Sequence, residues 1–280
     1  MKTAYLKFTP ALALLFALGA CDNIAEDERL VDYDRPSVDR NILIYEFTGQ
    51  HCMNCPSGAA TIHDIMEANP GQIIPICVHP ERTSFTFPPL GGIILTSEAS
   101  TFLYKEMKPD AFPAISVDGE EAITYNASQW SKEVAESKKN YSSAPADIHL
   151  NPTYDMAAHK LSVEYSIDFN EYTTTPMLAQ IYLVEDGIVG IQKNGSKFQT
   201  DYVHNHVLRL AAYADWGESI GETFEIGQSV AGTVEFELDE QWVAANCKVV
   251  GIILERGGHR VRQANQVDAI ASPDAPDAAE

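Results

Sequence analysis

Two cysteines separated by two residues can carry out redox chemistry. This chain has one such pair, Cys52 and Cys55. The pair can close a small disulfide ring, and the flanking pattern places it where a buried strand meets a helix. The amino terminus of a helix favours a thiolate, so we expect it to lower the pKa of the first, exposed thiol. Cys52 is then the predicted nucleophile of thiol–disulfide exchange, and Cys55 is the resolving thiol. His51, if protonated, would also stabilise the Cys52 thiolate.

Two explanations without exchange chemistry compete with this hypothesis. A zinc site needs two further ligands, and because the chain has no second Cys pair we expect no metal site. A static disulfide stays open as an alternative, since such bonds persist in oxidising compartments. Cys77 and Cys247 lie within apolar runs and are predicted to be buried core thiols, with a bridge between them also open.

A second candidate cluster is the histidine pair His204 and His206. If residues 202–210 form a strand, both side chains point to one face and could share a metal. No third ligand is evident nearby, and paired histidines on a strand usually form local hydrogen bonds. A helical continuation over residues 210–214 would remove the shared face.

The elements that must position the redox pair alternate between strand and helix periodicity. The first helix ends at Asn69-Pro70-Gly71, and the third strand turns at Asp118-Gly119. This order predicts an α/β fold, with an open sheet covered by helices. Strands are expected over residues 41–48, 73–78 and 114–117, and helices over 56–69, 97–107 and 128–139.

From residue 146 to about 270 the apolar residues alternate in repeated short runs separated by Gly and polar turns. Such a pattern predicts an all-β antiparallel, Ig-like sandwich. The segment over residues 142–146 is typical of a linker. We therefore expect two domains, over residues 41–143 and 144–270, followed by an acidic tail over 271–280.

The amino terminus has the pattern of an export signal. Lys2 and Lys7 precede an apolar run over residues 11–18, which ends in Gly19-Ala20-Cys21. Residues 1–20 are therefore predicted to be a signal peptide, and no later stretch is long and apolar enough to span a bilayer. This segment resembles the lipobox of bacterial lipoproteins, which implies cleavage before Cys21 and acylation, including palmitate, on that residue. An ordinary secretory signal with Cys21 incidental is the alternative. The polar, acidic segment over residues 21–40 is then a tether.

The charge balance narrows the choice of partners. The chain has 19 Lys+Arg and 40 Asp+Glu residues, and removal of the two signal lysines gives 17 − 40 = −23 with His neutral. A surface this acidic argues against binding to nucleic acid. The membrane is expected as a partner only through lipid on Cys21, and no cofactor is expected.

Residues 41–143 resemble the thioredoxin superfamily. Besides the redox pair, the resemblance rests on Glu46, six residues before the first cysteine, and on Phe112-Pro113, which opens the strand that turns at Asp118. It implies that Glu46 is the buried acid that assists proton transfer. It also implies that Pro113 is the cis proline that positions the substrate backbone.

The chain departs from the thioredoxin pattern next to the redox pair. His51 stands where the family has an aromatic residue, and Met53-Asn54 replaces Gly-Pro. An insertion over residues 83–95 is expected to form a loop near the site. The resemblance therefore does not carry over a reduction potential or a partner.

The whole mature chain resembles the Omp28-related outer-membrane lipoproteins of Bacteroidota. Three segments carry this resemblance: Cys52-Met53-Asn54-Cys55-Pro56, Leu183-Val184-Glu185-Asp186-Gly187, and Tyr202-Val203-His204-Asn205-His206-Val207-Leu208-Arg209. It implies a cell-envelope location at the outer membrane. The membrane face stays undetermined, because the acidic cluster after Cys21 resembles a surface-export signal whereas Asp22 resembles a retention signal.

Two function classes follow from these observations. The first is thiol–disulfide exchange on envelope proteins, in which Cys52 attacks, Cys55 resolves, Glu46 assists and Pro113 positions the partner. The second is a surface binding protein of the adhesin type, whose β-sandwich docks a protein or glycan while the disulfide is structural.

Overall fold

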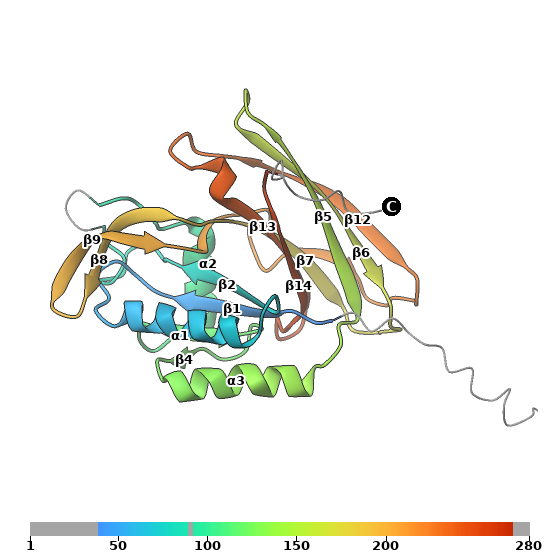
Figure 1. The fold of residues 1–280 in the computed structure, drawn as a ribbon. Helices are drawn as coiled ribbons and strands as arrows, with labels where there is room; N and C mark the ends of the chain where they lie inside the picture. Colours follow the sequence, from blue (N-terminus) through green and yellow to red (C-terminus); the bar gives the residue numbers. More distant parts are fainter. Residues whose placement is uncertain (1–38, 89–91, 271–280) are drawn as a thin grey trace, which may run out of the picture. The chain divides into compact units, whose positions relative to one another are not determined.

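A computed structural model describes residues 39–88 and 92–270 of the chain (Figure 1). The predicted signal peptide, Cys21, the tether up to residue 38, and the tail over residues 271–280 lie outside the described residues. Within the described ranges, no helix is long and apolar enough to cross a membrane.

The first half of the described chain has the predicted alternation of strands and helices. Every element lies within one residue of its expected bounds, and one short further strand is present. The elements are β1 (Ile42–Phe47), α1 (Cys55–Ala68), β2 (Ile73–Val78), α2 (Glu98–Met107), β3 (Ala114–Val117), β4 (Ile123–Thr124) and α3 (Ala127–Asn140).

Local sequence explains where α1 begins and ends. Pro56 lies in its first turn, where the missing backbone N–H removes no helical hydrogen bond. At the other end, the Asn69 side chain donates to the Ile65 carbonyl at 2.9 Å, and Gly71 has a positive φ of 75°. The helix is thus fixed at both ends, and its amino end presents the redox pair.

Strand β1 is buried on both faces. Ile42 and Ile44 pack toward α1 and α3, whereas Leu43, Tyr45 and Phe47 pack into the core that includes α2. Figure 1 shows α1 and α3 on one side of the sheet and α2 on the other. A strand covered by helices on both faces has a continuous apolar sequence, as this one does.

The second half is built of strands, as the alternation predicts. It contains β5 (Ala146–Asp155), β6 (Lys160–Phe169), β7 (Met177–Glu185), β8 (Ile188–Asn194), β9 (Lys197–His204), β10 (Val207–Ala211), β11 (Glu218–Gly221), β12 (Ser229–Glu237), the 3-10 helix η1 (Ala244–Asn246), β13 (Cys247–Glu255) and β14 (Val261–Asp268). Strands β12, β6 and β5 form a separate antiparallel sheet. Its apolar side chains share one core with residues of β7 and β13.

One sheet crosses the boundary near Ser143 at which the sequence predicts two domains. One sheet runs in the order β14-β13-β7-β10-β2-β1-β3-β4, with β11 paired to β7. Strand β10 joins the halves, because it pairs parallel to β2 and antiparallel to β7. The rings of Tyr45 and Tyr182, one from each half, meet edge to face in a shared core, and their hydroxyls lie 3.3 Å apart. The described residues accordingly form one compact unit.

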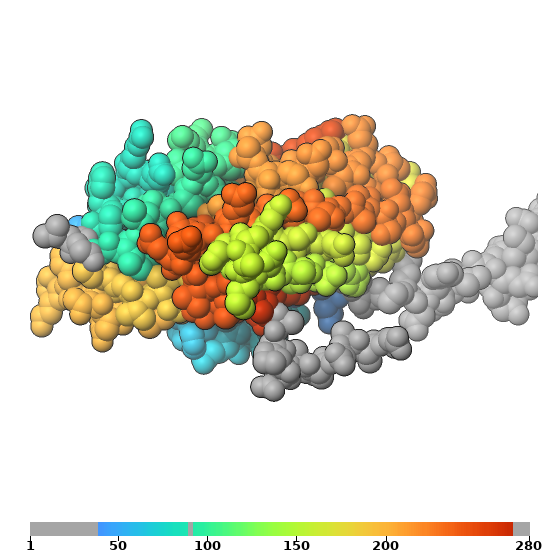
Figure 2. Space-filling view, turned by 90° about the horizontal axis from the view of Figure 1, so that it is seen from above, coloured from blue at the N-terminus to red at the C-terminus, as the bar shows by residue number. Residues whose placement is uncertain are grey.

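Strands β8 and β9 form a two-stranded hairpin apart from the main sheet. In Figure 1 the hairpin extends from the end of the sheet at which α1 begins. Seen from above, the hairpin and the residues that precede α2 lie at the same end of the molecule (Figure 2). This end carries the candidate site.

Candidate functional site

Cys52 and Cys55 form a disulfide at the amino end of α1, as the spacing predicts. The predicted exposure of Cys52 is wrong. Cys52 and Cys55 are each only 2% exposed. Residues at the amino end of a surface helix are normally open to solvent, so other elements of the fold must cover the two cysteines.

The β8–β9 hairpin supplies the cover on one side of the disulfide loop. The buried Gln192 side chain donates to the carbonyls of Cys52 at 3.0 Å and Gly49 at 3.2 Å. Backbone hydrogen bonds add to this contact, from Lys193 N to Gln50 O at 2.7 Å and from Gly195 N to Met53 O at 3.0 Å. The hairpin therefore holds the loop through its backbone, which local sequence does not reveal.

The segment expected to be an inserted loop covers the other side. His51 N donates to the Phe85 carbonyl at 2.8 Å, and a Cβ on Gly49 would lie 2.3 Å from the same oxygen. Glycine is thus required at position 49 by this close approach. The His51 ring meets Phe198 of β9 edge to face, with ring centroids 5.4 Å apart. The part of the insertion over residues 89–91 lies outside the described residues.

Pro113 lies against the helix that carries the redox pair. The peptide bond between Phe112 and Pro113 is cis. A Cβ on Gly58 would lie 3.0 Å from Cγ of Pro113, so the proline packs on α1 one turn beyond Cys55. The glycine leaves the space that this contact needs.

Glu46 is buried behind the disulfide, at 2% exposure. Its partner in the register of β1 and β2 is Cys77, whose thiol donates to Oε2 at 3.1 Å. The other oxygen, Oε1, has no hydrogen-bond partner among the described residues. Burial raises the pKa of Glu46 to about 7, while the hydrogen bond from Cys77 opposes this rise.

Glu46 and Cys55 line one pocket of about 140 Å³ between α1, β2 and the hairpin. His79 and His204 also line it, and their rings meet edge to face with centroids 6.2 Å apart. Burial lowers the pKa of His79 to about 3 and the pKa of His204 to about 4. His79 was missed by the sequence analysis; the only signal was its position two residues after Cys77, directly after a buried strand.

The two histidines of the second candidate cluster do not share a strand face. His204 ends β9, whereas His206 lies in the turn before β10 with a positive φ of 57°. The His206 ring nitrogen Nδ1 lies 3.1 Å from Asp186 Oδ1, and its backbone N–H donates to the same oxygen at 2.7 Å. The predicted alternative of local hydrogen bonding therefore applies to His206.

Cys77 and Cys247 are both free and buried. The Cys77 thiol donates to Glu46, and the Cys247 thiol donates to the Val243 carbonyl at 3.6 Å. The bridge between them, left open by the sequence, is therefore not formed.

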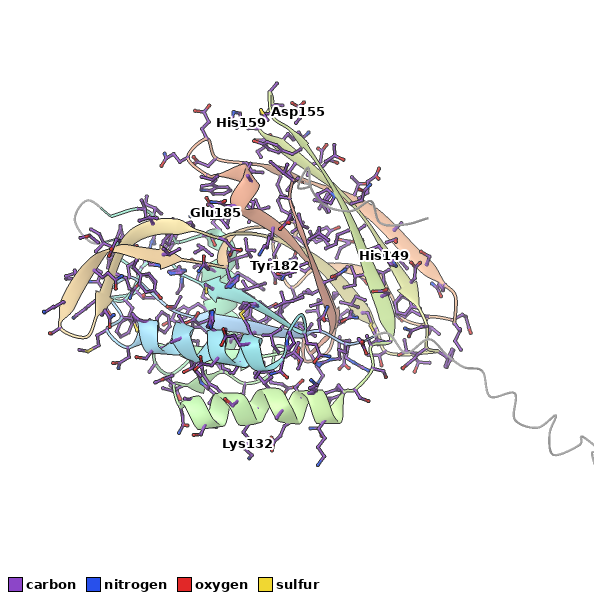
Figure 3. All side chains as sticks on the ribbon, in the orientation of Figure 1. Lys132, His149, Asp155, His159, Tyr182 and Glu185 are labelled. Carbon is purple, nitrogen blue, oxygen red and sulfur yellow. A yellow bond between two sulfur atoms is a disulfide. The ribbon has the colours of Figure 1, made fainter. Side chains whose placement is uncertain are left out.

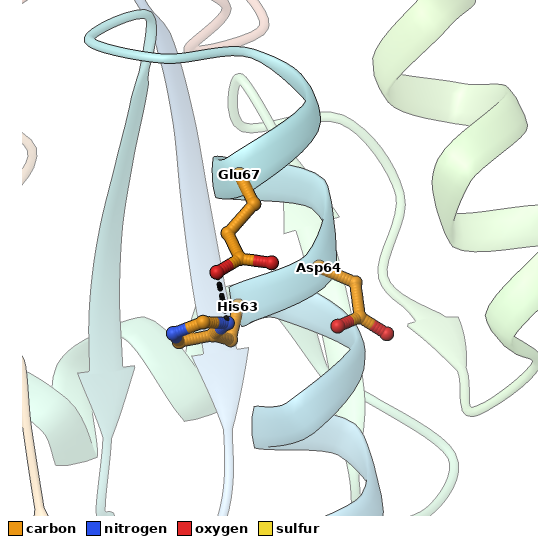
Figure 4. A group of neighbouring side chains, drawn as sticks. All are labelled: His63, Asp64 and Glu67. Atoms are coloured by element: carbon orange, nitrogen blue, oxygen red, sulfur yellow. Dashed lines mark ion pairs between the residues drawn. The ribbon is translucent and has the colours of Figure 1, made fainter.

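Residues His63, Asp64 and Glu67 form the one group of donor side chains, within residues 39–88 and 92–270, whose ligand atoms lie within 4.8 Å of one another. All three are exposed, and His63 Nδ1 lies 3.8 Å from Glu67 Oε1 (Figure 4). They lie along α1, and His63 also lines the pocket described above. Exposed acidic groups of this kind are common without an ion.

Comparisons with known proteins give a family match and similar solved structures. The sequence model of a family described as outer membrane protein Omp28 matches residues 101–271. The structure of HBP35 of Porphyromonas gingivalis is 17% identical, covers 87% of this chain and 79% of that one, and has a TM-score of 0.69. A domain of the outer membrane lipoprotein Omp28 from Porphyromonas gingivalis is 21% identical, over 45% of this chain and 88% of that domain, with a TM-score of 0.33. No curated protein matches the chain.

Proposed function

The chain belongs to the Omp28 family of outer membrane proteins, and from this premise we propose that it is a lipid-anchored protein that exchanges disulfides with other envelope proteins. The family places it in the cell envelope. The Cys52–Cys55 pair is the reacting group in this proposal. Cys21 is the site of the lipid.

The proposal includes an assignment of the two halves. The first half is a thioredoxin-like module, which is supported by the element order from β1 to α3 and by the disulfide at the start of α1. The second half is an Ig-like sandwich, supported by the core that the sheet of β5, β6 and β12 shares with β7 and β13. The likeness to HBP35, at 17% identity, bears on the fold alone.

The observation that carries the proposal is the gathering of three groups around one disulfide. The pair lies at a helix amino terminus, Pro113 packs on the next turn, and the Glu46 carboxyl lines the pocket that Cys55 also lines. A disulfide that only crosslinks the chain needs no buried carboxyl beside it, because burying a polar group without full hydrogen bonding is unfavourable. Exchange chemistry gives each group a role.

The exchange begins from the reduced protein, in which Cys52 and Cys55 are thiols. The Cys52 thiolate attacks one sulfur of a partner disulfide, which forms a mixed disulfide and releases the other partner sulfur as a thiolate. Cys55 then loses its proton toward Glu46 and attacks Cys52, which restores the Cys52–Cys55 bond and releases the second partner thiolate. The partner is reduced by two electrons, and the protein is oxidised by two. Pro113 lies where it can position the partner backbone.

The cover over Cys52 adds a condition. Because Cys52 is 2% exposed, a partner sulfur reaches it only after the hairpin has moved away from residues 49–53. Exchange in this protein is therefore gated by a conformational step.

A trapping experiment tests the exchange. The full chain is expressed in its native envelope as Cys55→Ser and as Cys52→Ser, free thiols are blocked, and adducts are compared on non-reducing gels. The Cys55→Ser variant should accumulate mixed disulfides, because the releasing thiol is lost, and Cys52→Ser should trap far fewer. Cys247→Ser, which alters a free buried cysteine, is the matched control.

Two results would reject the exchange. One is equal and negligible adducts from both variants. The other is a reduction potential of the Cys52–Cys55 pair below about −300 mV, where structural disulfides lie.

A second candidate function is favoured by the apolar side chains near the covered disulfide. Phe87, Ile94 and Val189 are between 60% and 68% exposed, and Phe198 and Val203 of β9 are nearly half exposed. Exposed apolar residues that gather on one part of a surface are typical of binding sites. If the disulfide proves structural, this end is the first place to seek a docking site for a protein or glycan.

A further inference from the structure

The pocket behind the disulfide is rich in side chains that bind transition metals. Of the eight histidines in the chain, four line it: His63, His79, His204 and His206. Cys77 and Glu46 line it as well. Imidazole, thiolate and carboxylate together are a donor set suited to zinc and its neighbours in the d-block.

The buried donor atoms in this pocket have lone pairs without partners. His79 Nδ1, His204 Nε2 and Glu46 Oε1 are all buried and lack a hydrogen bond within the described residues. Each imidazole ring forms a hydrogen bond with the backbone. The partner of the His79 ring is Cys77, and the partner of the His204 ring is Ile191. A metal-binding histidine is typically fixed in this way through its second nitrogen. Buried polar atoms without partners are rare in folded proteins, so three around one pocket indicate a missing ligand.

We propose that this pocket binds a divalent cation of the zinc class through Cys77, His79 and His204, with Glu46 Oε1 as the fourth donor. Cys77 lies in β2, His79 directly follows that strand, His204 ends β9 and Glu46 lies in β1, so the ion would connect the hairpin to the main sheet. The proposal stands on the pocket and its donor atoms, and its test does not use the exchange reaction, although Glu46 has a role in both proposals.

The protonation states agree with this assignment. Burial keeps both histidines neutral at neutral pH, so no proton competes for their lone pairs. Burial raises the pKa of the Cys77 thiol, and a divalent cation would offset that effect by binding the thiolate. Binding therefore releases one proton from Cys77.

The proposed ligand atoms are spread around the pocket. Its donor atoms are not gathered, since within residues 39–88 and 92–270 only the group of His63, Asp64 and Glu67 has three ligand atoms within 4.8 Å of one another. Binding must then draw His204, at the end of the hairpin, toward Cys77. Both residues line the same pocket of about 140 Å³.

The exposed group on α1 provides the matched control. His63 and Glu67 side chains are 70% and 71% exposed, and Asp64 points away from their ion pair (Figure 4). His63→Gln removes this group's nitrogen donor. It leaves the buried donors unchanged.

The test uses the full chain with its disulfide intact, freed of metal by a chelator. Zn²⁺ binding is measured by calorimetry, and Co²⁺ serves as the spectroscopic probe, because a bound thiolate gives a sulfur-to-metal charge-transfer band. We expect one Zn²⁺ per chain, and affinity losses of more than about tenfold in each of Cys77→Ser, His79→Gln and His204→Gln, since even outer-shell partners are worth 10- to 100-fold. His63→Gln should bind as tightly as the original chain.

Three results would overturn the proposal. They are absence of Zn²⁺ binding by the metal-free chain, loss of binding in His63→Gln with retention in Cys77→Ser, and a Co²⁺ spectrum without a band that depends on Cys77. Circular dichroism of each variant confirms that it is folded. His79→Gln and His204→Gln lie on different elements, so a folding defect in one leaves the other informative.

Discussion

Arg209 of β10 and Glu185 of β7 form a buried ion pair, in which the arginine atoms Nε and Nη2 each lie 2.8 Å from Glu185 Oε2. Glu185 Oε1 accepts from Val243 N at 2.9 Å, and Arg209 Nη1 donates to the Ile94 carbonyl at 3.1 Å. The pair joins two segments that carry the family resemblance. Both side chains are buried, and Glu185 is labelled in Figure 3.

Removing one partner of this ion pair should destabilise the protein strongly. Arg209→Leu leaves a buried carboxylate without its cation, which typically costs about 3–5 kcal/mol of unfolding free energy. Urea denaturation measures the change. Lys132→Met is the control, because Lys132 pairs with Glu136 on the exposed face of α3 and points away from the sheet (Figure 3). A loss from Arg209→Leu no larger than the control's, which should stay within about 1 kcal/mol, would show that the pair is not a stabilising contact.

Loosening the hairpin should expose the disulfide. Gln192→Ala removes the side-chain hydrogen bonds to Gly49 and Cys52, which we expect to weaken the cover by about 1–2 kcal/mol. Reduction of the Cys52–Cys55 bond by a small thiol should then become roughly tenfold faster, as followed by alkylation of the released thiols. Thr200→Ala, an exposed change on β9, is the matched control. Unchanged reduction in Gln192→Ala would mean that the hairpin does not limit access.

Asp186 should contribute stability at neutral pH that acid removes. Burial alone would raise its pKa, but the hydrogen bonds and charges of His206 and Lys248 hold the pKa well below the usual range. A lowered pKa stabilises the fold above the unfolded value, and this contribution is lost as pH falls toward the folded value. Asp186→Asn should therefore cost about 1–3 kcal/mol at pH 7 and progressively less below about pH 4. Urea unfolding at pH 7 and below about pH 4 measures the two losses of unfolding free energy. An equal loss at both would contradict the role given to the Asp186 carboxylate.

The shared sheet predicts one cooperative unfolding transition. Trp130 reports on the first half and Trp242 on the second, so chains that retain only one of the three tryptophans, either Trp130 or Trp242, should give coincident urea transitions. Limited proteolysis should not yield two stable fragments divided near Ser143, because separation would expose the core that contains Tyr45 and Tyr182. Two distinct midpoints, or such a pair of fragments, would contradict the single transition and support two domains.

The proposed lipid anchor is tested at Cys21. Cys21→Ala should remove acylation and move the protein from the membrane fraction to the soluble fraction, because acyl chains supply the membrane affinity. Cys247→Ala, a change at a free buried cysteine, should leave the protein with the membranes. Recovery of Cys21→Ala entirely in membranes would reject the anchor.

The elements of the first half, and the redox pair at the start of α1, could be predicted because their signals are local. A repeat of apolar residues with a period of 2 or 3.6 is recognisable within about ten residues of sequence. A turn such as Asn69-Pro70-Gly71 ends a helix independently of distant parts of the chain. The link between Pro113 and the pair came from family resemblance. No periodicity connects residues so far apart.

Contacts between distant segments were decided only by the tertiary structure. Gln192 covers a cysteine 140 positions earlier. Strand β10 enters the sheet beside β2, although Val207 lies 207 − 77 = 130 positions after its partner Cys77. The alternation within a strand determines which side chains are buried, but it does not determine which strand becomes its neighbour. The sequence by itself therefore determined the disulfide and the elements around it. The burial of Cys52, the single sheet and the histidine-lined pocket arise from long-range pairing, which local patterns do not encode.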